Sequence, residues 1–136
     1  MKKVISVLSL VALLVCLMAS SVCASGSVGV TPRWTGIADV NAFLDFYGTE
    51  GEATLASTKD SSTTKLEGVV TIYKWANGQW VYVDSASKST TRATLGIGLV
   101  FDGISGVQYK MEATVTAYSG TTVIEEFTDV KYATCP

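Results

Sequence analysis

Polar and apolar residues alternate along most of the chain that follows residue 39. Three stretches show this period of two, namely 40–47, 93–101 and 107–117, and 122–132 is expected to form a last strand. Alternation is the pattern of a strand with one buried face, and clusters of glycine, serine and aspartate separate the strands at the spacing that is typical of sandwiches and barrels. No helical period appears after residue 24. The pattern therefore predicts an all-β domain, a single antiparallel β-sandwich of about seven to eight strands.

The stretch from Lys65 to Ser87 contains the strongest hairpin signal. Two apolar runs meet at Asn77-Gly78, a dipeptide that tolerates the positive φ angles of a two-residue type I′ turn. Counting outward from this turn gives the pairs of one face as Trp75–Trp80, Tyr73–Tyr82 and Thr71–Asp84, and those of the other as Lys74–Val81, Ile72–Val83 and Val70–Ser85. Both faces of the predicted hairpin are therefore apolar, one aromatic and one aliphatic.

The aromatic face of this hairpin is the candidate binding site. Its residues are Tyr73, Trp75, Trp80 and Tyr82, with Lys74, Gln79 and Asp84 as polar neighbours at the rim. An exposed patch of several large rings usually marks a contact site. The alternative is that the rings are core. We favour exposure because a consistent core row already exists on the aliphatic face, at Leu66, Val70, Ile72, Val81 and Val83.

Two details of the second half refine the fold. Gly96 and Gly98 lie opposite an apolar row, which predicts a bulge or the close approach of another segment. Tyr109 follows an Asp-Gly turn at the start of the best alternating strand, as in the tyrosine corner of immunoglobulin-like domains, and its hydroxyl is expected to bond a nearby backbone group. This tyrosine corner predicts that the sandwich is immunoglobulin-like.

The charged residues of 122–132 suit an edge strand. We recognise no internal repeat.

The N-terminal residues predict export. Two lysines precede an apolar run over 4–18, and small residues follow it, so residues 1–24 are expected to be a secretory signal peptide. A retained membrane anchor is the alternative, but the apolar run is short for a span. The prediction then divides the rest into a flexible lead-in, 25–32, and a β-sandwich domain, 33–136, released outside the cell with no membrane contact after cleavage. The net charge of −2 argues against nucleic acid as a partner.

The cysteines allow three interpretations of the state of Cys135. Cys16 and Cys23 fall in the predicted leader, so Cys135 remains alone near the C-terminus. An odd cysteine in an exported chain suggests an intermolecular disulfide, here a homodimer through Cys135, or a free thiol at a frayed end. Cleavage before Cys23 would instead allow a Cys23–Cys135 bridge.

Catalytic chemistry finds little support in the composition. The chain contains no histidine, which excludes Ser-His-Asp and Cys-His catalysis and imidazole zinc sites. Two S-x-x-K matches, 62–65 and 85–88, lie in polar segments rich in serine and threonine, where chance is the better explanation. We therefore expect no catalytic residues, no metal and no cofactor.

Several short motifs carry a family resemblance. They are P-R-W-T at 32–35, I-Y-K followed by G-x-W within 72–80, G-V-Q-Y-K at 106–110, and the late Cys135. With the leader, these motifs resemble a group of small secreted proteins of Gram-positive bacteria, of the Firmicutes or Clostridia type, that carry one uncharacterised β-rich domain. The resemblance implies a bacterial source, export and a β-rich fold. It implies no activity and supplies no functional residues.

Together these observations predict a secreted, non-enzymatic binding module that contacts an extracellular protein or polysaccharide through the aromatic hairpin face. Two alternatives belong to other classes. A structural or self-assembling matrix protein would use the edge 122–132 and Cys135. A secreted bacteriocin-like effector would engage a membrane or a receptor.

Overall fold

The computed structural model describes residues 34–136, so the predicted signal peptide and lead-in lie outside the described residues. The described chain forms seven strands: β1 (Ile37–Tyr47), β2 (Glu50–Lys59), β3 (Lys65–Ala76), β4 (Gln79–Thr90), β5 (Thr94–Asp102), β6 (Gln108–Ser119) and β7 (Thr122–Thr134). No helix in this part of the chain is long and apolar enough to cross a membrane.

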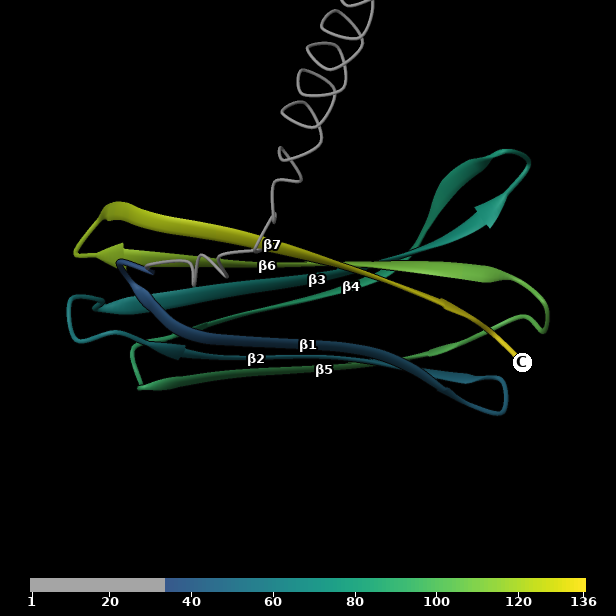
Figure 1. Cartoon of the computed structure of the whole chain (residues 1–136), viewed down its shortest axis with the longest axis horizontal. Helices are drawn as coiled ribbons and strands as arrows, with labels where there is room; N and C mark the ends of the chain where they lie inside the picture. Colours follow the sequence, from purple (N-terminus) through teal and green to yellow (C-terminus); the bar gives the residue numbers. More distant parts are fainter. Residues whose placement is uncertain (1–33) are drawn as a thin grey trace, which may run out of the picture. The chain divides into compact units, whose positions relative to one another are not determined.

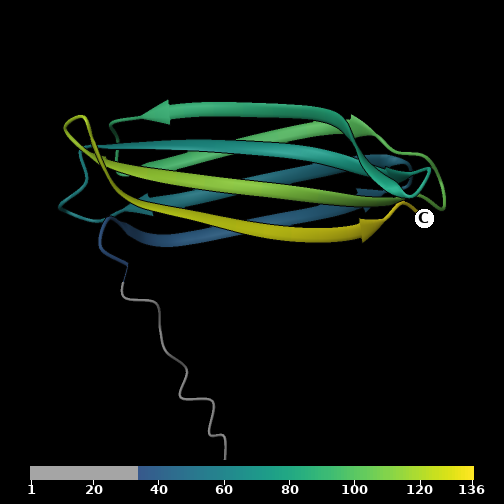
Figure 2. The ribbon, with the colours of Figure 1, turned by 90° about the horizontal axis from the view of Figure 1, so that it is seen from above.

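The strands form two antiparallel sheets packed face to face (Figure 1). The first sheet has the order β1-β2-β5, and the second has the order β4-β3-β6-β7. Figure 2 shows the long strands of both sheets running in similar directions. Along the chain, β1 and β2 belong to the first sheet, β3 and β4 to the second, β5 to the first, and β6 and β7 to the second. This is an immunoglobulin-type order in which the fourth strand pairs beside the third. The predicted all-β sandwich is confirmed.

The core lies between the sheets and follows the predicted alternation. Every second side chain of β6 is buried to 1% exposure or less, from Tyr109 to Ala117. On β3, Leu66, Val70 and Ile72 are fully buried and face the first sheet. Gly68 belongs to this inward row, and a Cβ atom there would lie 2.6 Å from a methyl group of Leu95. The side chains of the first sheet therefore leave no room for a side chain at Gly68.

The expected tyrosine corner is present. Tyr109 is 1% exposed, and its hydroxyl oxygen accepts a hydrogen bond of 2.9 Å from the backbone N–H of Ile104. Its ring lies 5.3 Å from the ring centroids of Phe46 and Phe101. The hydroxyl group of the buried Tyr109 side chain thus holds the loop after β5 against the core.

The prediction for Gly96 and Gly98 is wrong within the described residues. Strand β5 pairs with β2 in an unbroken register, and no atom lies within 4 Å of the position that a Cβ would take at either glycine. The physical reason is topological, because β5 is an edge strand and both glycines point to the outer face of the first sheet.

Candidate binding surface

The β3–β4 hairpin turns where the sequence predicted. Strand β3 ends at Ala76 and β4 begins at Gln79, so Asn77 and Gly78 are the two turn residues. Their φ angles are 52° and 76°, both in the left-handed region that a type I′ turn requires. This turn chemistry fixes the register of the residues nearest the tip.

The predicted register holds for the first three pairs and then fails. Trp75 pairs with Trp80, Lys74 with Val81 and Tyr73 with Tyr82, as expected. A β-bulge then places an extra residue on β4, so the next pairs are Ile72–Asp84, Thr71–Ser85 and Val70–Ala86 rather than those counted from the turn. The carboxylate of Asp84 accepts a hydrogen bond of 2.8 Å from the backbone N–H of Ser85, which satisfies a donor beside the irregularity.

The four predicted rings gather on the outer face of the second sheet. The ring centroids of Trp75 and Trp80 are 5.1 Å apart, and those of Tyr73 and Tyr82 are 6.5 Å apart. Trp75 is 45% exposed and Tyr82 is 57% exposed, while the other two rings are half-buried. The aliphatic residues of β3 fill the core instead. We call these four rings, together with Tyr132, the aromatic cluster.

Tyr132 and Lys110 complete the site, and sequence reasoning missed both. The ring of Tyr132 on β7 lies 5.7 Å from Trp80 although β4 and β7 are opposite edges of the sheet. Figure 1 shows why, since the free end of the hairpin rises away from the first sheet, on the outer side of the second. The Lys110 ammonium lies 4.5 Å from the ring centroid of Tyr73 and 5.3 Å from that of Trp80. It also forms an ion pair of 2.6 Å with Glu112.

The predicted polar rim is not where the sequence placed it. Lys74 and Gln79 alternate with the rings and therefore lie on the opposite face of the hairpin. The bulge pairs Asp84 with the buried Ile72, which moves this carboxylate to that opposite face as well. Near the rings, the charged neighbours are instead Lys110 and its partner Glu112.

The two central strands contain a short repeat that we did not recognise in the sequence. Residues 65–73 read K-L-E-G-V-V-T-I-Y, and residues 110–118 read K-M-E-A-T-V-T-A-Y. Because β3 and β6 are antiparallel, Lys65 pairs with Tyr118 and Tyr73 pairs with Lys110. A lysine over a tyrosine ring therefore occurs at both ends of the same sheet face, and one of the two belongs to the aromatic cluster.

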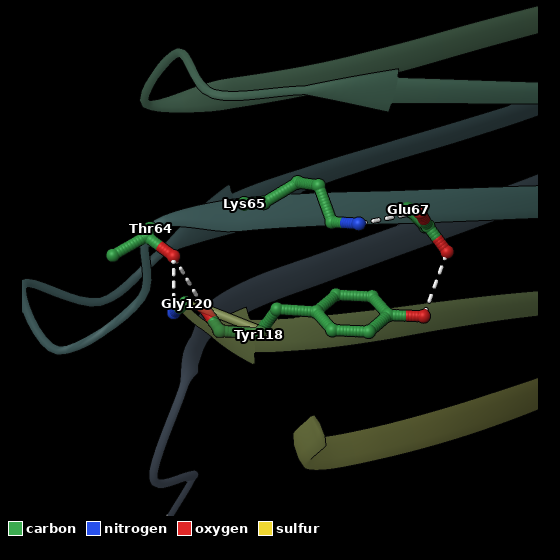
Figure 3. A network of polar contacts seen from close by, with 5 residues as sticks. All are labelled: Thr64, Lys65, Glu67, Tyr118 and Gly120. Carbon is green, nitrogen blue, oxygen red and sulfur yellow. Dashed lines mark hydrogen bonds and ion pairs between the residues drawn. The ribbon is translucent and has the colours of Figure 1, made fainter. Parts of the chain in front are cut away.

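Figure 3 shows the second copy of this arrangement. It lies at the start of β3, the end of that strand opposite to the hairpin tip. The Lys65 ammonium lies 3.9 Å from the centroid of the Tyr118 ring and 2.8 Å from a carboxylate oxygen of Glu67. The Tyr118 hydroxyl donates a hydrogen bond of 2.8 Å to the other oxygen of Glu67. Bonds from Lys65 and then Tyr118 hold the pKa of Glu67 below its ordinary value. The bond to Glu67 raises the pKa of Lys65 and of Tyr118.

Cys135 lies in the core rather than at a frayed end. Its side chain is 1% exposed, its backbone N–H donates to Val107, and its carbonyl oxygen accepts from Gly106, at 3.0 and 2.8 Å. A disulfide between two copies therefore requires the C-terminal residues to detach first. Cys23, the other partner considered, lies outside the described residues.

The described residues offer no group of three or more histidine, cysteine or acidic side chains placed to hold a metal ion. In the first S-x-x-K match, the Ser62 hydroxyl donates to the carbonyl of Thr35, while Lys65 is paired with Glu67. The serine and lysine of this match therefore bond other groups.

Comparison with known proteins identifies no family. No family model and no curated protein matches the chain. A search of solved structures aligns it with Spo0M, a sporulation control protein from Bacillus subtilis, at 13% identity and a TM-score of 0.42. The alignment covers 73% of this chain, which spans 49% of the length of Spo0M.

Proposed function

We propose that this chain is an exported, non-enzymatic binding module that contacts a protein partner through the aromatic cluster. The observation that carries the proposal is the outward placement of five rings at one end of the second sheet, three of them 45% to 58% exposed. Support for export comes from the predicted signal peptide.

The energetics of the cluster favour its burial by a partner. A large ring buries about 150–250 Å² when it is covered, so the cluster amounts to an apolar patch of several hundred Å². Tryptophan and tyrosine dominate the residues that contribute most to binding at protein interfaces. Lys110 brings little net charge to the patch because Glu112 neutralises it. The surface is therefore apolar at its centre, as the cores of protein interfaces are.

The orientation of the rings favours a protein over a polysaccharide. The planes of the contacting ring pairs are inclined by 66°, 84° and 46°, so the rings present edges and faces in different directions. A sugar chain that stacks on aromatic rings needs faces that lie roughly parallel to its own. Inclined rings suit the irregular side chains of a protein surface better.

Trp75 provides the most direct test. Its ring is exposed and lies near the hairpin tip. The substitution Trp75→Ala therefore leaves the core intact and removes a large share of the contact area. Wild-type and variant proteins serve as baits for cell-surface extracts, and captured proteins are identified by mass spectrometry. We expect a protein that is retained by the wild type and held at least about tenfold more weakly by the variant.

Phe43→Ala is the matched control. Phe43 is also an exposed aromatic residue, at 59%, but it belongs to β1 in the other sheet. We expect this variant to capture the same protein as the wild type. Equal losses in both variants would contradict the assignment of the site. A glycan array probed with the same three proteins would overturn the choice of partner if it gave Trp75-dependent binding to a sugar.

A further inference from the structure

The free edge of β5 is unlike the other sheet edges in residues 34–136. Strand β5 pairs with β2 without any register shift, and its only charged residue is Asp102 at its end. It contains no proline, and two of its outward positions are glycines. Edges that carry no bulge, no proline and almost no charge of their own are templates for pairing with another strand.

Each of the other three edges carries the features that discourage such pairing. The ladders of β1, β4 and β7 with their neighbours are all interrupted by a register shift. Their charged residues are Asp39 and Asp45 on β1, Asp84 and Lys88 on β4, and Glu125, Glu126, Asp129 and Lys131 on β7. Bulges and charges at an edge act against intermolecular pairing, so β5 is the exception.

The hydrogen bonds at the two ends of the β2–β5 ladder show which backbone groups of β5 face away from β2. Lys59 donates its N–H to the carbonyl of Ala93, and Gly103 donates to Thr49, at 2.9 and 2.7 Å. Hydrogen-bonded positions alternate in an antiparallel ladder, so the even-numbered residues of β5 direct their N–H and C=O groups to the open edge. The Lys88 ammonium confirms this at one position, because it donates to the carbonyl of Gly96 at 3.2 Å.

We propose that two copies of this chain pair antiparallel along β5, with Gly96 opposite the partner's Gly98. This register brings open-edge positions together on both chains. It also brings Arg92, in the bend that precedes β5, toward the partner's Asp102 at each end of the shared ladder. Neither side chain forms an ion pair within the described residues, so the second copy supplies the opposite charge that each lacks.

The side chains of the same register are compatible on both faces. On the inner face, Leu95 lies opposite the partner's Leu99, and Ile97 lies opposite its own equivalent. On the outer face, the central positions are glycines with open space around the place of a Cβ, so no side chain of β5 obstructs the second strand at these positions. Lys88 releases the Gly96 carbonyl when the partner strand arrives. The β1-β2-β5 sheets of the two copies then form one continuous sheet of six strands.

This inference goes beyond the proposed function because it concerns a different sheet. The aromatic cluster belongs to the second sheet, whereas β5 is an edge of the first. Pairing through β5 does not involve the cluster residues, and the resulting particle carries two clusters.

Charge reversal tests the register by sedimentation velocity over a range of protein concentrations, with reductant present to exclude disulfides. In Arg92→Asp, two aspartates face each other at each end of the ladder, and in Asp102→Arg two arginines do so. We expect either variant alone to raise the dimer dissociation constant at least about tenfold. A mixture of the two variants restores both opposite-charge pairs, so we expect a heterodimer with nearly wild-type affinity.

Gly98→Pro tests the edge itself. This substitution removes an N–H that faces the open edge and leaves the ladder with β2 intact, so we expect a folded monomer. Hydrogen exchange provides the second measurement, because the amides of Gly96, Gly98 and Val100 should be protected in the wild-type dimer, and those of Gly96 and Val100 should exchange fast in the variant. Lys131→Asp, a charge reversal on the β7 edge, is the control and should leave the dimer unchanged.

Three results would overturn the proposal. The first is a wild-type protein that stays monomeric at all concentrations. The second is a dimer that survives Gly98→Pro. The third is a mixture of the two charge variants that dimerises no more tightly than either variant alone. Mixing would restore a complementary interface, but it would not rescue a defect in folding.

Discussion

Tyr109 has the largest fully buried side chain of the domain, and its hydroxyl group accepts the backbone N–H of Ile104. In Tyr109→Phe this donor loses its acceptor while the ring stays in place. We expect a loss of about 1–3 kcal/mol in the free energy of unfolding, measured by urea denaturation. Tyr82→Phe is the control, because that hydroxyl bonds Ser85 at the exposed surface. Similar losses in the two variants would contradict the role assigned to Tyr109.

Glu67 makes stability depend on pH. Its pKa is lowered in the folded state, so its contribution is complete at neutral pH and disappears as the pH falls from the ordinary glutamate range through the lowered pKa. Lys65 and Tyr118 have raised pKa values, so their contribution is lost at alkaline pH, as the pH rises through those values. We expect Glu67→Gln to reduce both pH-dependent losses, measured as denaturation midpoints across a pH series.

Glu50→Gln provides the comparison for this pH series. Glu50 is exposed at the start of β2 and forms no ion pair within residues 34–136. Its substitution should leave both limbs of the profile as they are in the wild type. A Glu67→Gln profile that overlays that of Glu50→Gln would show that the contacts of Figure 3 contribute nothing measurable to stability.

Single residues were predictable where a local rule applies. Alternation identified the inward row of β3, and together with the predicted turn it placed Tyr73, Trp75, Trp80 and Tyr82 on one face. It could not reveal Tyr132, because the contact with Trp80 depends on how the hairpin end bends over a strand far away in the sequence. The same holds for Lys110, whose position beside Tyr73 depends on the pairing of β3 with β6.

At the scale of the element, the hairpin turn is the feature that the sequence specifies best. Gly78 has a φ of 76° and no neighbouring atom within 4 Å of a Cβ, so Gly78→Ala introduces backbone strain alone. We expect this substitution to destabilise the protein by about 1 kcal/mol. Gly96→Ala has equally open surroundings without a positive φ and should be neutral or slightly stabilising, measured by thermal unfolding at low concentration.

The bulge in β4 was not predictable in the same way. The turn fixes the three nearest pairs, but a bulge depends on the packing of the whole sheet, and β4 bears one extra residue beyond Tyr82. One shifted position was enough to move Asp84 from the predicted rim to the other face. The predicted polar rim failed for this reason and because Lys74 and Gln79 alternate with the rings.

At the scale of the molecule, the class of fold followed from strand alternation and turn spacing, and the tyrosine corner correctly indicated its immunoglobulin-like order. The partners of each strand did not follow, because pairing between distant strands leaves no local signal. The exposed glycines of β5 illustrate this limit. Two glycines opposite an apolar row look the same in the sequence whether a segment covers them or an edge leaves them open.

The reactivity of the Cys135 thiol measures how firmly the end of β7 is held in the sandwich. Because this thiol is buried beside Gly48 and Gly103, in the loops that follow β1 and β5, we expect it to react with a thiol reagent only when the C-terminal residues detach. Its labelling rate in native buffer should be at least about a hundredfold below that in urea. Rapid labelling of the native protein, or a disulfide dimer that forms without denaturant, would show that this end of β7 is not held as described.

The end of β7 has a practical consequence for any study of recognition. Tyr132 belongs to the aromatic cluster, and the exposed Pro136 lies four residues further along, on the same end of the molecule as the hairpin tip. A purification tag or a sensor-chip linkage added after Pro136 would therefore crowd the very rings under study. Strand β1 begins at the far end of the long axis, so attachment ahead of Trp34 would leave those rings facing the solution.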